Sequence, residues 1–303
     1  MTHSLRLACA IALFSAAASY AQVPAIPGVP NTARQAADSI DPEKIRAHVR
    51  FLASDLLEGR GPGLRGAQIA AEYIATQFAL NGLKPAGDNG TYFQKVPLYA
   101  VHTVEDQTTA SFVPQNGQPI PLKYGEDYVA KDQTGAASAD IDAPIVFVGY
   151  GIDAPEYHWN DYSRVDVKGK VLLVIVNEPP STDEAFFKGK TMTYYGRWTY
   201  KYEEASRKGA LGVLIIHRTD LASYPWHVVR DSQAIEKSYL QGDPTATLQA
   251  ASWIQHDVAQ KLLTAAGQGT VDAMIDAAGK PGFHATELPV HFKAHIASKV
   301  RRY

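Results

Sequence analysis

The apolar residues in the first part of this chain recur every three to four positions, the period of an amphipathic helix. Asp41-Pro42-Glu43 supplies an N-cap, a proline for the first helical position and an acid for the first turn, so a helix is predicted to start here. A second helix is predicted from about residue 66 to residue 81, with Gly82 as its stop. The predicted apolar stripe of the first helix is Ile45, Val49, Leu52 and Leu56, and the predicted buried face of the second is Ala67, Ala70, Ala71, Ile74 and Phe78.

After Pro85 the pattern becomes that of strands. Residues 92–96 and 98–104 alternate between apolar and polar positions, and Asn116-Gly117 between two short apolar runs predicts a hairpin over residues 111–122. Residues 288–296 alternate strictly and predict a further strand near the end of the sequence.

Between these segments lie three continuous apolar runs, at residues 145–148, 171–176 and 212–216. A helix is predicted between the second and third runs, over residues 195–208. Continuous apolar strands that alternate with helices are typical of a sheet buried on both faces. A brief strand at residues 253–254 and two short helices at 256–266 and 271–278 complete the pattern, which predicts a mixed α/β fold.

Composition limits the class of protein. The chain has 303 residues and a formal net charge of −2, a length that suggests about one or two domains. Its longest basic run is the pair Arg301-Arg302. A near-neutral chain without basic clusters gives no electrostatic reason to expect a nucleic-acid partner.

Residues 1–21 have the composition of an export signal, with a basic start ending at Arg6, an apolar core over residues 7–18, and Ser19 and Ala21 at the −3 and −1 positions before Gln22. The core is shorter than the ~20 apolar residues that span a bilayer. We therefore expect cleavage, no membrane anchor afterwards, and a secreted or periplasmic protein. Cys9, the one cysteine, lies inside this signal, so a disulfide scaffold and a cysteine zinc site are excluded from the mature chain. Residues 22–39 are expected to be a proline-rich linker.

Histidines are the remaining candidates for metal ligands. His291 and His295 are four residues apart, but the period of two around them favours a solvated strand face over a metal site. His217 and Asp220 follow a predicted strand, and a structural or cleft-lining loop is favoured there. A zinc hydrolase needs about three ligands and an open position, and the sequence contains no His-x-Asp pair. No metal ligand or catalytic residue is predicted in this chain.

An aromatic segment is the main candidate for a binding surface. Tyr194, Tyr195, Arg197 and Trp198 stand close together in a run with further aromatic residues. Aromatic side chains with an arginine are the composition of contact surfaces, although packing in the core is the alternative. These four residues are predicted to line a substrate or partner cleft.

Several segments together resemble a known family. Residues 51–60, Phe-Leu-Ala-Ser-Asp-Leu-Leu-Glu-Gly-Arg, followed by Gly63 and Gly66, are similar to the N-terminal motif of bacterial secreted zinc-dependent aminopeptidases, as are residues 70–75 and 82–85. Residues 144–180 and 205–216 resemble the protease-associated domain inserted in such enzymes. The resemblance covers about residues 40–303 and keeps the order of its segments.

This resemblance implies a domain organisation. It implies a peptidase domain that starts in residues 40–110, a protease-associated domain in residues 111–285 that folds alone, and a strand in residues 286–303 that returns to the catalytic domain. It also implies a pair of zinc ions held by His, Asp and Glu, with a Glu as general base, at positions downstream of the insert that are not matched here. The insert borders the substrate cleft in this family, consistent with a lining role for Tyr194 to Trp198.

Two functions follow as alternatives. The first is the N-terminal portion of a zinc aminopeptidase, which binds no zinc and is inactive alone, while the complete enzyme hydrolyses N-terminal peptide bonds. The second is a non-enzymatic protease-associated module that binds peptides or proteins. A hydrolase using residues inside this chain is disfavoured by the missing motifs. A His-x-Asp pair encoded shortly after Tyr303 would favour the first alternative.

Overall fold

The computed structural model describes residues 30–303, so the predicted export signal lies outside the described residues. The chain divides into two compact units, residues 1–74 and 75–303, and the division falls within one helix, α3 (Arg65–Leu80). The fold is mixed α/β, as predicted. In the described part of the chain, no helix combines the length and the apolar character needed to cross a bilayer.

The first unit is helical. It contains α1 (Asn31–Asp38), α2 (Pro42–Leu52), the 3₁₀ segment η1 (Asp55–Arg60) and the start of α3. Asp41 caps α2 as predicted, and its carboxylate accepts the Glu43 N–H at 2.9 Å. The Phe51 ring stacks on Tyr73 of α3 with centroids 4.2 Å apart. Helix α1 lies within the range predicted as a linker, and all its residues are exposed.

A close backbone approach explains one glycine of the N-terminal motif. A Cβ atom on Gly66 would lie 1.8 Å from the carbonyl oxygen of Leu57. Leu57 is the buried residue of η1. Any side chain at position 66 would therefore push the start of α3 away from η1.

The predicted buried face of the two helices is only partly buried. Ala70 is buried, but Ile74 and Phe78 are exposed, so the prediction is wrong for these two residues. Ile45 is 53% exposed and Leu56 is 86% exposed. The helical period identifies which residues share a face, but two helices can cover only a narrow stripe of each other.

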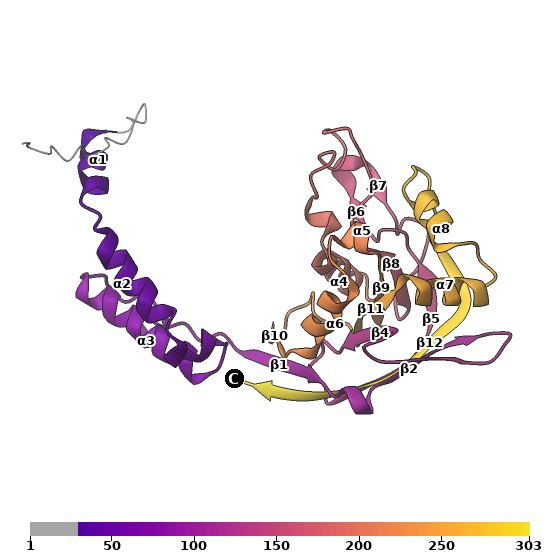
Figure 1. Cartoon of the computed structure of the whole chain (residues 1–303), viewed down its shortest axis with the longest axis horizontal. Coiled ribbons are helices and arrows are strands. Elements are labelled where there is room, and N and C mark those ends of the chain that lie inside the picture. The colour runs from indigo at the N-terminus through magenta and orange to yellow at the C-terminus, as the bar shows by residue number, and fades with distance from the viewer. Residues whose placement is uncertain (1–29) are drawn as a thin grey trace, which may run out of the picture. The chain divides into compact units, whose positions relative to one another are not determined.

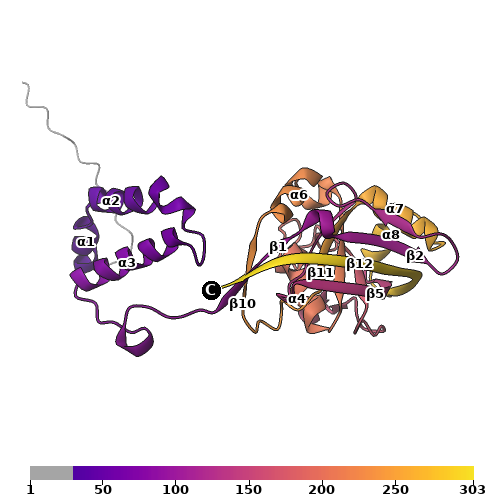
Figure 2. The ribbon, with the colours of Figure 1, turned by 90° about the horizontal axis from the view of Figure 1, so that it is seen from below.

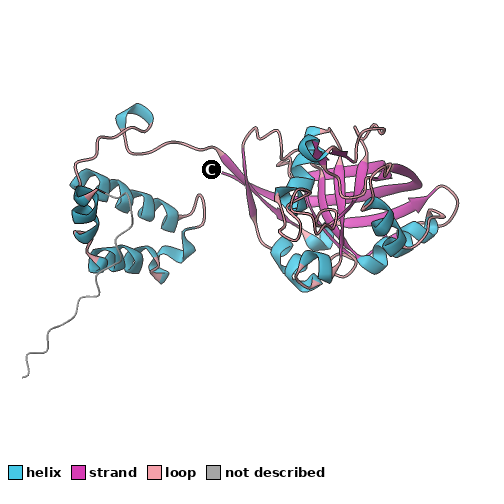
Figure 3. Ribbon diagram, turned by 90° about the horizontal axis from the view of Figure 1, so that it is seen from above, coloured by secondary structure: helices cyan, strands magenta, loops and turns pink. Residues whose placement is uncertain are grey.

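Within residues 75–303 the core is a ten-stranded mixed sheet (Figures 1 and 3). Its order is β10-β1-β12-β5-β8-β9-β11-β4, and β2 pairs with β12 and β3. The strands are β1 (Leu98–Thr103), β2 (Thr109–Pro114), β3 (Ile120–Leu122), β4 (Tyr128–Lys131), β5 (Ser138–Phe147), β8 (Val171–Ile175), β9 (Gly212–His217), β10 (Lys237–Leu240), β11 (Ala250–Gln255) and β12 (Thr286–Arg302). The pair β6 (Asp153–Ala154) and β7 (Trp159–Asn160) is separate.

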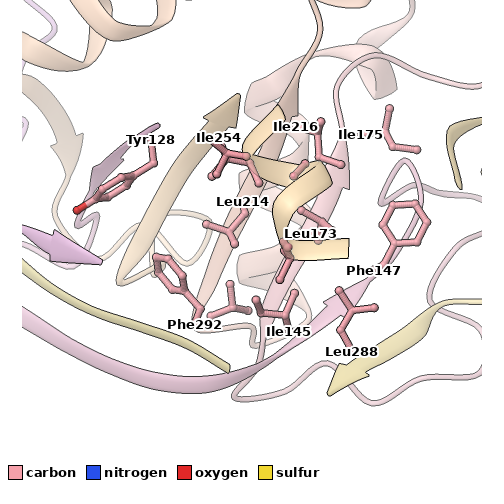
Figure 4. Close-up of a cluster of buried hydrophobic side chains, with 14 of the residues drawn as sticks. Tyr128, Ile145, Phe147, Leu173, Ile175, Leu214, Ile216, Ile254, Leu288 and Phe292 are labelled. Carbon is pink, nitrogen blue, oxygen red and sulfur yellow. The ribbon is translucent and has the colours of Figure 1, made fainter. Parts of the chain in front are cut away.

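The strands at the centre of this sheet are parallel. They are buried on both faces, and this two-sided burial confirms the prediction. β5, β8, β9 and β11 run parallel. Leu173 and Leu214 pack with α7 (His256–Ala265) and α8 (Val271–Ala278), in the cluster that Figure 4 shows. Leu172 and Val213, one position earlier on each strand, pack with α4 (Trp198–Arg207) and α6 (Trp226–Ala234) on the other face. Because successive side chains on a strand point to opposite faces of the sheet, each apolar run contributes residues to both cores.

Several predicted elements are confirmed and others are not. The hairpin is β2 and β3, with Phe112 opposite Ile120, and α8 has the predicted bounds. Residues 92–96 are not a strand, because the Asp88 side chain binds the Lys95 N–H at 2.8 Å and Pro97 has no N–H to donate. Helix α4 begins at Trp198, after a separate 3₁₀ turn, η5 (Tyr194–Gly196). The strands β4 and β10 and the helix α6 were not predicted.

Strand β12 pairs with three other strands of the sheet, and it is the long yellow arrow in Figure 2. One edge of β12 pairs with β5, and the other pairs with β2 over residues 290–295 and with β1 over residues 298–302. Val290, Phe292 and Ile296 are completely buried. The boundaries predicted for an inserted domain and its independent folding both stay predictions. The sheet includes β12, which lies outside residues 111–285.

Side chains, instead of a backbone ladder, connect β1 to β4. Thr103 Oγ1 donates to the Ala130 carbonyl at 3.0 Å, and the Tyr99 hydroxyl donates to the Gln133 carbonyl. Lys131 Nζ donates to the Val101 carbonyl at 3.4 Å. The sheet therefore curves back on itself, because these side chains join β4, at one end of the strand order, to β1, the strand next to the other end.

Removal of a large side chain from β12 should destabilise the whole sheet. Phe292 packs against Phe112 with centroids 6.2 Å apart and is fully buried. We expect Phe292→Ala to lower the free energy of unfolding by ~3–5 kcal/mol, measured by denaturant titration. Lys293→Ala, at the adjacent exposed position, should change it by no more than about 0.5 kcal/mol. Equal effects of the two substitutions would contradict the central role of β12.

Candidate functional site

An aromatic cluster lies beside the predicted site. It consists of Tyr157, Trp159, Phe186, Phe187, Tyr195 and Tyr200. The centroids of Tyr157 and Phe187 are 4.4 Å apart, and Tyr195 meets Tyr200 edge-on at 5.0 Å. Aromatic contacts of this kind add specific geometry to apolar burial. Much of the aromatic content of the predicted site therefore packs internally.

The loop that carries Phe186 and Phe187 is held in an unusual conformation. Phe187 and Lys188 have φ angles of 46° and 52°, a region that residues with side chains rarely adopt. Glu178 fixes the loop at its other end, where its carboxylate accepts the Thr193 N–H at 2.8 Å and the Thr193 hydroxyl. The packing of Phe187, which is completely buried, opposes the backbone strain.

Two buried charged groups lie under the aromatic cluster. Asp161 accepts the Trp159 indole N–H at 2.9 Å and the Ile152 N–H at 3.0 Å. Lys201 Nζ donates to the Tyr195 carbonyl at 2.7 Å. Burial raises the pKa of Asp161 to about 7 and lowers the pKa of Lys201 to about 7, while each charge favours the charged form of the other.

The structure divides the four predicted site residues between two places. The Tyr195 hydroxyl donates to Glu156 at 2.7 Å, and the exposed Tyr194 donates to Glu203 at 2.6 Å, both next to the aromatic cluster. Trp198 instead packs edge-on against Tyr202 at 5.7 Å and lines a separate cavity. Arg197 lies between them, exposed, as the N-cap residue of α4. Their role in a cleft stays a prediction.

The cavity beside Trp198, here called the Lys237 cavity, has a volume of about 260 Å³. Its walls come from α4, β10 and the segment after β4, and include Lys131, Gln133 and Lys237. Sequence reasoning missed these residues. Lys131 is the last residue of a short strand whose other residues are apolar or aromatic. Lys237 follows more than a hundred positions later, so no sequence motif includes both lysines. Only the tertiary fold brings them together.

The histidines do not form a zinc site in the described structure. His291 Nδ1 pairs with Asp142 at 2.8 Å, and His295 Nδ1 pairs with Asp140 at 2.7 Å, as two separate pairs on the outer face of β12. His217 is buried among aromatic rings, where burial lowers its pKa. No group of three or more potential ligands occurs among residues 30–303. The donor sets present do not fit a zinc ion, which needs about three protein ligands.

Comparisons with known proteins give limited help. No protein-family model matches the chain, and no curated protein matches it in sequence. Similar solved structures include an aminopeptidase from Aneurinibacillus sp. strain AM-1, 17% identical with a TM-score of 0.36, which covers 89% of this chain and 47% of that one. They also include BSAP, a zinc aminopeptidase from Bacillus subtilis, 14% identical with a TM-score of 0.27, covering 85% of this chain and 43% of that one.

The chain thus spans less than half the length of these two structures. Similarity at this level identifies no family.

The buried Lys201 should make stability depend on pH. Between about pH 7 and pH 10 the unfolded chain keeps this lysine protonated while the folded chain does not, because its folded-state pKa is lowered from 10.5 to about 7. The unfolded state binds more protons, so the contribution of Lys201 to stability rises with pH over this range. We expect Lys201→Met to lack this rise, in denaturant titrations at several pH values.

The matched control is Lys123→Met, because Lys123 is exposed and pairs only with Glu126. Its stability should follow the pH dependence of the unmodified chain. A constant difference between the unmodified chain and Lys201→Met across pH 7–10 would show that Lys201 keeps its ordinary protonation in the folded state.

Proposed function

We propose that this chain is the N-terminal portion of a secreted or periplasmic zinc-dependent aminopeptidase, including its protease-associated domain. Hydrolysis of N-terminal peptide bonds would belong to the whole enzyme, with peptides as substrates. The proposal rests on the order of motifs in residues 40–303 and on one structural observation, the large apolar face that the two motif helices leave exposed.

That face is formed by α2, η1 and α3. Ile45, Val49 and Leu56 are all more than half exposed. A stripe of several large apolar side chains at helical spacing is normally covered, since each one buried contributes about 1.5–3 kcal/mol. The helices themselves are well specified, by the Asp41 cap and by the contact of Gly66 with Leu57. A specified pair of helices with an uncovered apolar stripe supports a role as part of a larger domain.

No catalytic step is assigned to residues 30–303. Their histidines and carboxylates do not fit a zinc ion, so the zinc of the proposed enzyme would be held by other residues. Tyr194, Tyr195, Arg197 and Trp198 would contribute to the wall of the substrate cleft. Residues 1–21 would be removed on export, so that the mature chain starts at Gln22 and has no membrane anchor.

A second candidate is a protease-associated module that binds a ligand without catalysis. The observation that favours it is the Lys237 cavity, which is built entirely within residues 75–303. That unit has two apolar cores and a nearly closed sheet of its own. Ligand binding there would need no further domain.

Because the zinc ligands of the proposed enzyme would lie outside residues 30–303, we predict no aminopeptidase activity for residues 22–303 alone. Because the described donor sets do not fit zinc, we expect no tight zinc ion in elemental analysis and no chelator-sensitive release of nitroaniline from aminoacyl-nitroanilides. Intact mass of the exported protein would show whether Gln22 is the first residue. Chelator-sensitive turnover in a preparation free of host peptidases would contradict the proposal.

The exposed apolar face should be measurable by dye binding. We expect the double variant Ile45→Gln, Val49→Gln to bind less of a hydrophobic fluorescent dye, because two large apolar groups are removed from an uncovered surface. Its thermal stability should fall by less than that of Phe292→Ala, since neither residue is buried. Lys44→Gln, on the same helix, is the control and should leave dye binding unchanged. A loss of stability as large as that of a core variant would show that the face is already covered.

A further inference from the structure

The chain contains three asparagines that are each followed by glycine, Asn81, Asn89 and Asn116. An Asn-Gly pair can lose the asparagine amide without an enzyme, because glycine has no Cβ to hinder the approach of its backbone nitrogen to the preceding side chain. All three asparagines are exposed, so exposure does not distinguish them. The hydrogen bonds around each pair do distinguish them.

The first pair is held at the end of α3. The Asn81 side chain donates through Nδ2 to the Gln77 carbonyl at 2.7 Å. The Gly82 N–H donates to the Ala79 carbonyl at 3.0 Å. Attack of the Gly82 nitrogen on the Asn81 side chain would require both hydrogen bonds to break.

The second pair lies in a short turn that is hydrogen-bonded on both sides. Asn89 has a left-handed backbone, with φ 52° and ψ 31°, and this ψ directs the Gly90 nitrogen away from the Asn89 side chain. The Gly87 N–H donates to the Thr91 carbonyl at 2.7 Å, and the Thr91 hydroxyl donates to the Asp88 carbonyl at 2.7 Å. Ring closure requires rotation about the Asn89 Cα–C bond, which would separate Thr91 from both partners.

The third pair, Asn116 and Gly117, lies in the loop between β2 and β3. Residues 115–119 are all exposed. Among residues 30–303, no hydrogen bond involves any of residues 116–119. The Asn116 side chain and the Gly117 nitrogen can therefore approach each other without the loss of a hydrogen bond.

We infer that Asn116 is a site of spontaneous deamidation in the folded chain, and that the fold protects Asn81 and Asn89. The Gly117 nitrogen attacks Asn116 Cγ and forms a new C–N bond, while the Cγ–Nδ2 bond breaks. The amide leaves as ammonia, with the proton that Gly117 loses. Water then opens the five-membered succinimide at either carbonyl carbon, which gives aspartate or isoaspartate at position 116.

The modification changes the surface of the hairpin and leaves its pairing in place. Each product adds one negative charge, and isoaspartate also lengthens the loop backbone by one carbon. The ladder of the hairpin pairs residues 110–112 with residues 120–122, outside the loop. We therefore expect the modified chain to stay folded and to be more acidic. The reaction consumes only water, so it does not depend on the proposed peptidase function.

Incubation of the purified chain at mildly alkaline pH, followed by peptide mapping with mass spectrometry, tests the site. We expect Asn116 to be converted at least tenfold faster than Asn81 or Asn89 in the folded chain. In denaturant the three rates should agree within a few-fold, because the hydrogen bonds that distinguish the pairs are lost. Fragmentation by electron transfer separates isoaspartate from aspartate, and both should appear at position 116.

Comparable rates at all three asparagines in the folded chain would overturn the inference. So would a rate at Asn116 that is tenfold lower in the folded chain than in denaturant, because the loop would then be protected as well. This comparison uses the unmodified chain and needs no variant to fold.

Variants identify the source of the acidic form on ion exchange. Asn116→Gln should prevent its accumulation, because a six-membered ring closes more slowly, whereas Asn81→Gln is the matched control and should leave the accumulation unchanged. Asn116→Asp should elute with the modified chain and unfold at the same denaturant concentration as the unmodified one. Accumulation at an unchanged rate in Asn116→Gln that is folded by circular dichroism would contradict the assignment to Asn116.

Discussion

The backbone pairing of β12 is the constraint on which the larger unit depends. This strand of 17 residues pairs with β5 on one edge, up to residue 297, and on the other edge with β2 over residues 290–295 and then with β1 over residues 298–302. Because its inward positions alternate strictly, Leu288, Val290, Phe292 and Ile296 all enter the same core as the helices α7 and α8. A shift of one residue in register would turn every one of these side chains to solvent. β12 therefore completes one of the two cores of the parallel centre, the one that also contains α7 and α8.

The Lys237 cavity follows from how the sheet closes. Where β12 meets its neighbours, backbone groups satisfy one another, but β1 and β4 are joined by side chains of Tyr99, Thr103 and Lys131. The cavity is lined by Lys131 and Gln133 from this seam together with residues of α4 and β10. The buried Lys131 amine donates to the Val101 carbonyl across this seam and to the Ile235 carbonyl after α6.

The sequence pattern was sufficient wherever local chemistry decides the structure. The Asp41 cap, the hairpin at Asn116-Gly117 and the apolar runs of β8 and β9 each depend on residues close together, and each is confirmed. It was insufficient where distant residues decide. Residues 92–96 alternate like a strand, yet the Asp88 carboxylate accepts the Lys95 N–H instead of a neighbouring strand. Ile74 and Phe78 follow the helical period but are exposed, because periodicity does not show what covers a face. Lys131, Gln133 and Lys237 carry no motif and meet only through the curvature of the sheet.

The proposed peptidase role and the Lys237 cavity involve different parts of the chain. The peptidase proposal depends on α2 and α3, whose large side chains are exposed although their caps and close contacts are well defined. The Lys237 cavity is lined by residues between 131 and 251, all of them in the unit of residues 75–303. The aromatic cluster beside Tyr195 stabilises the start of α4, and α4 carries Trp198 into the cavity. The predicted aromatic segment thus packs internally at Tyr195 and lines a separate cavity at Trp198.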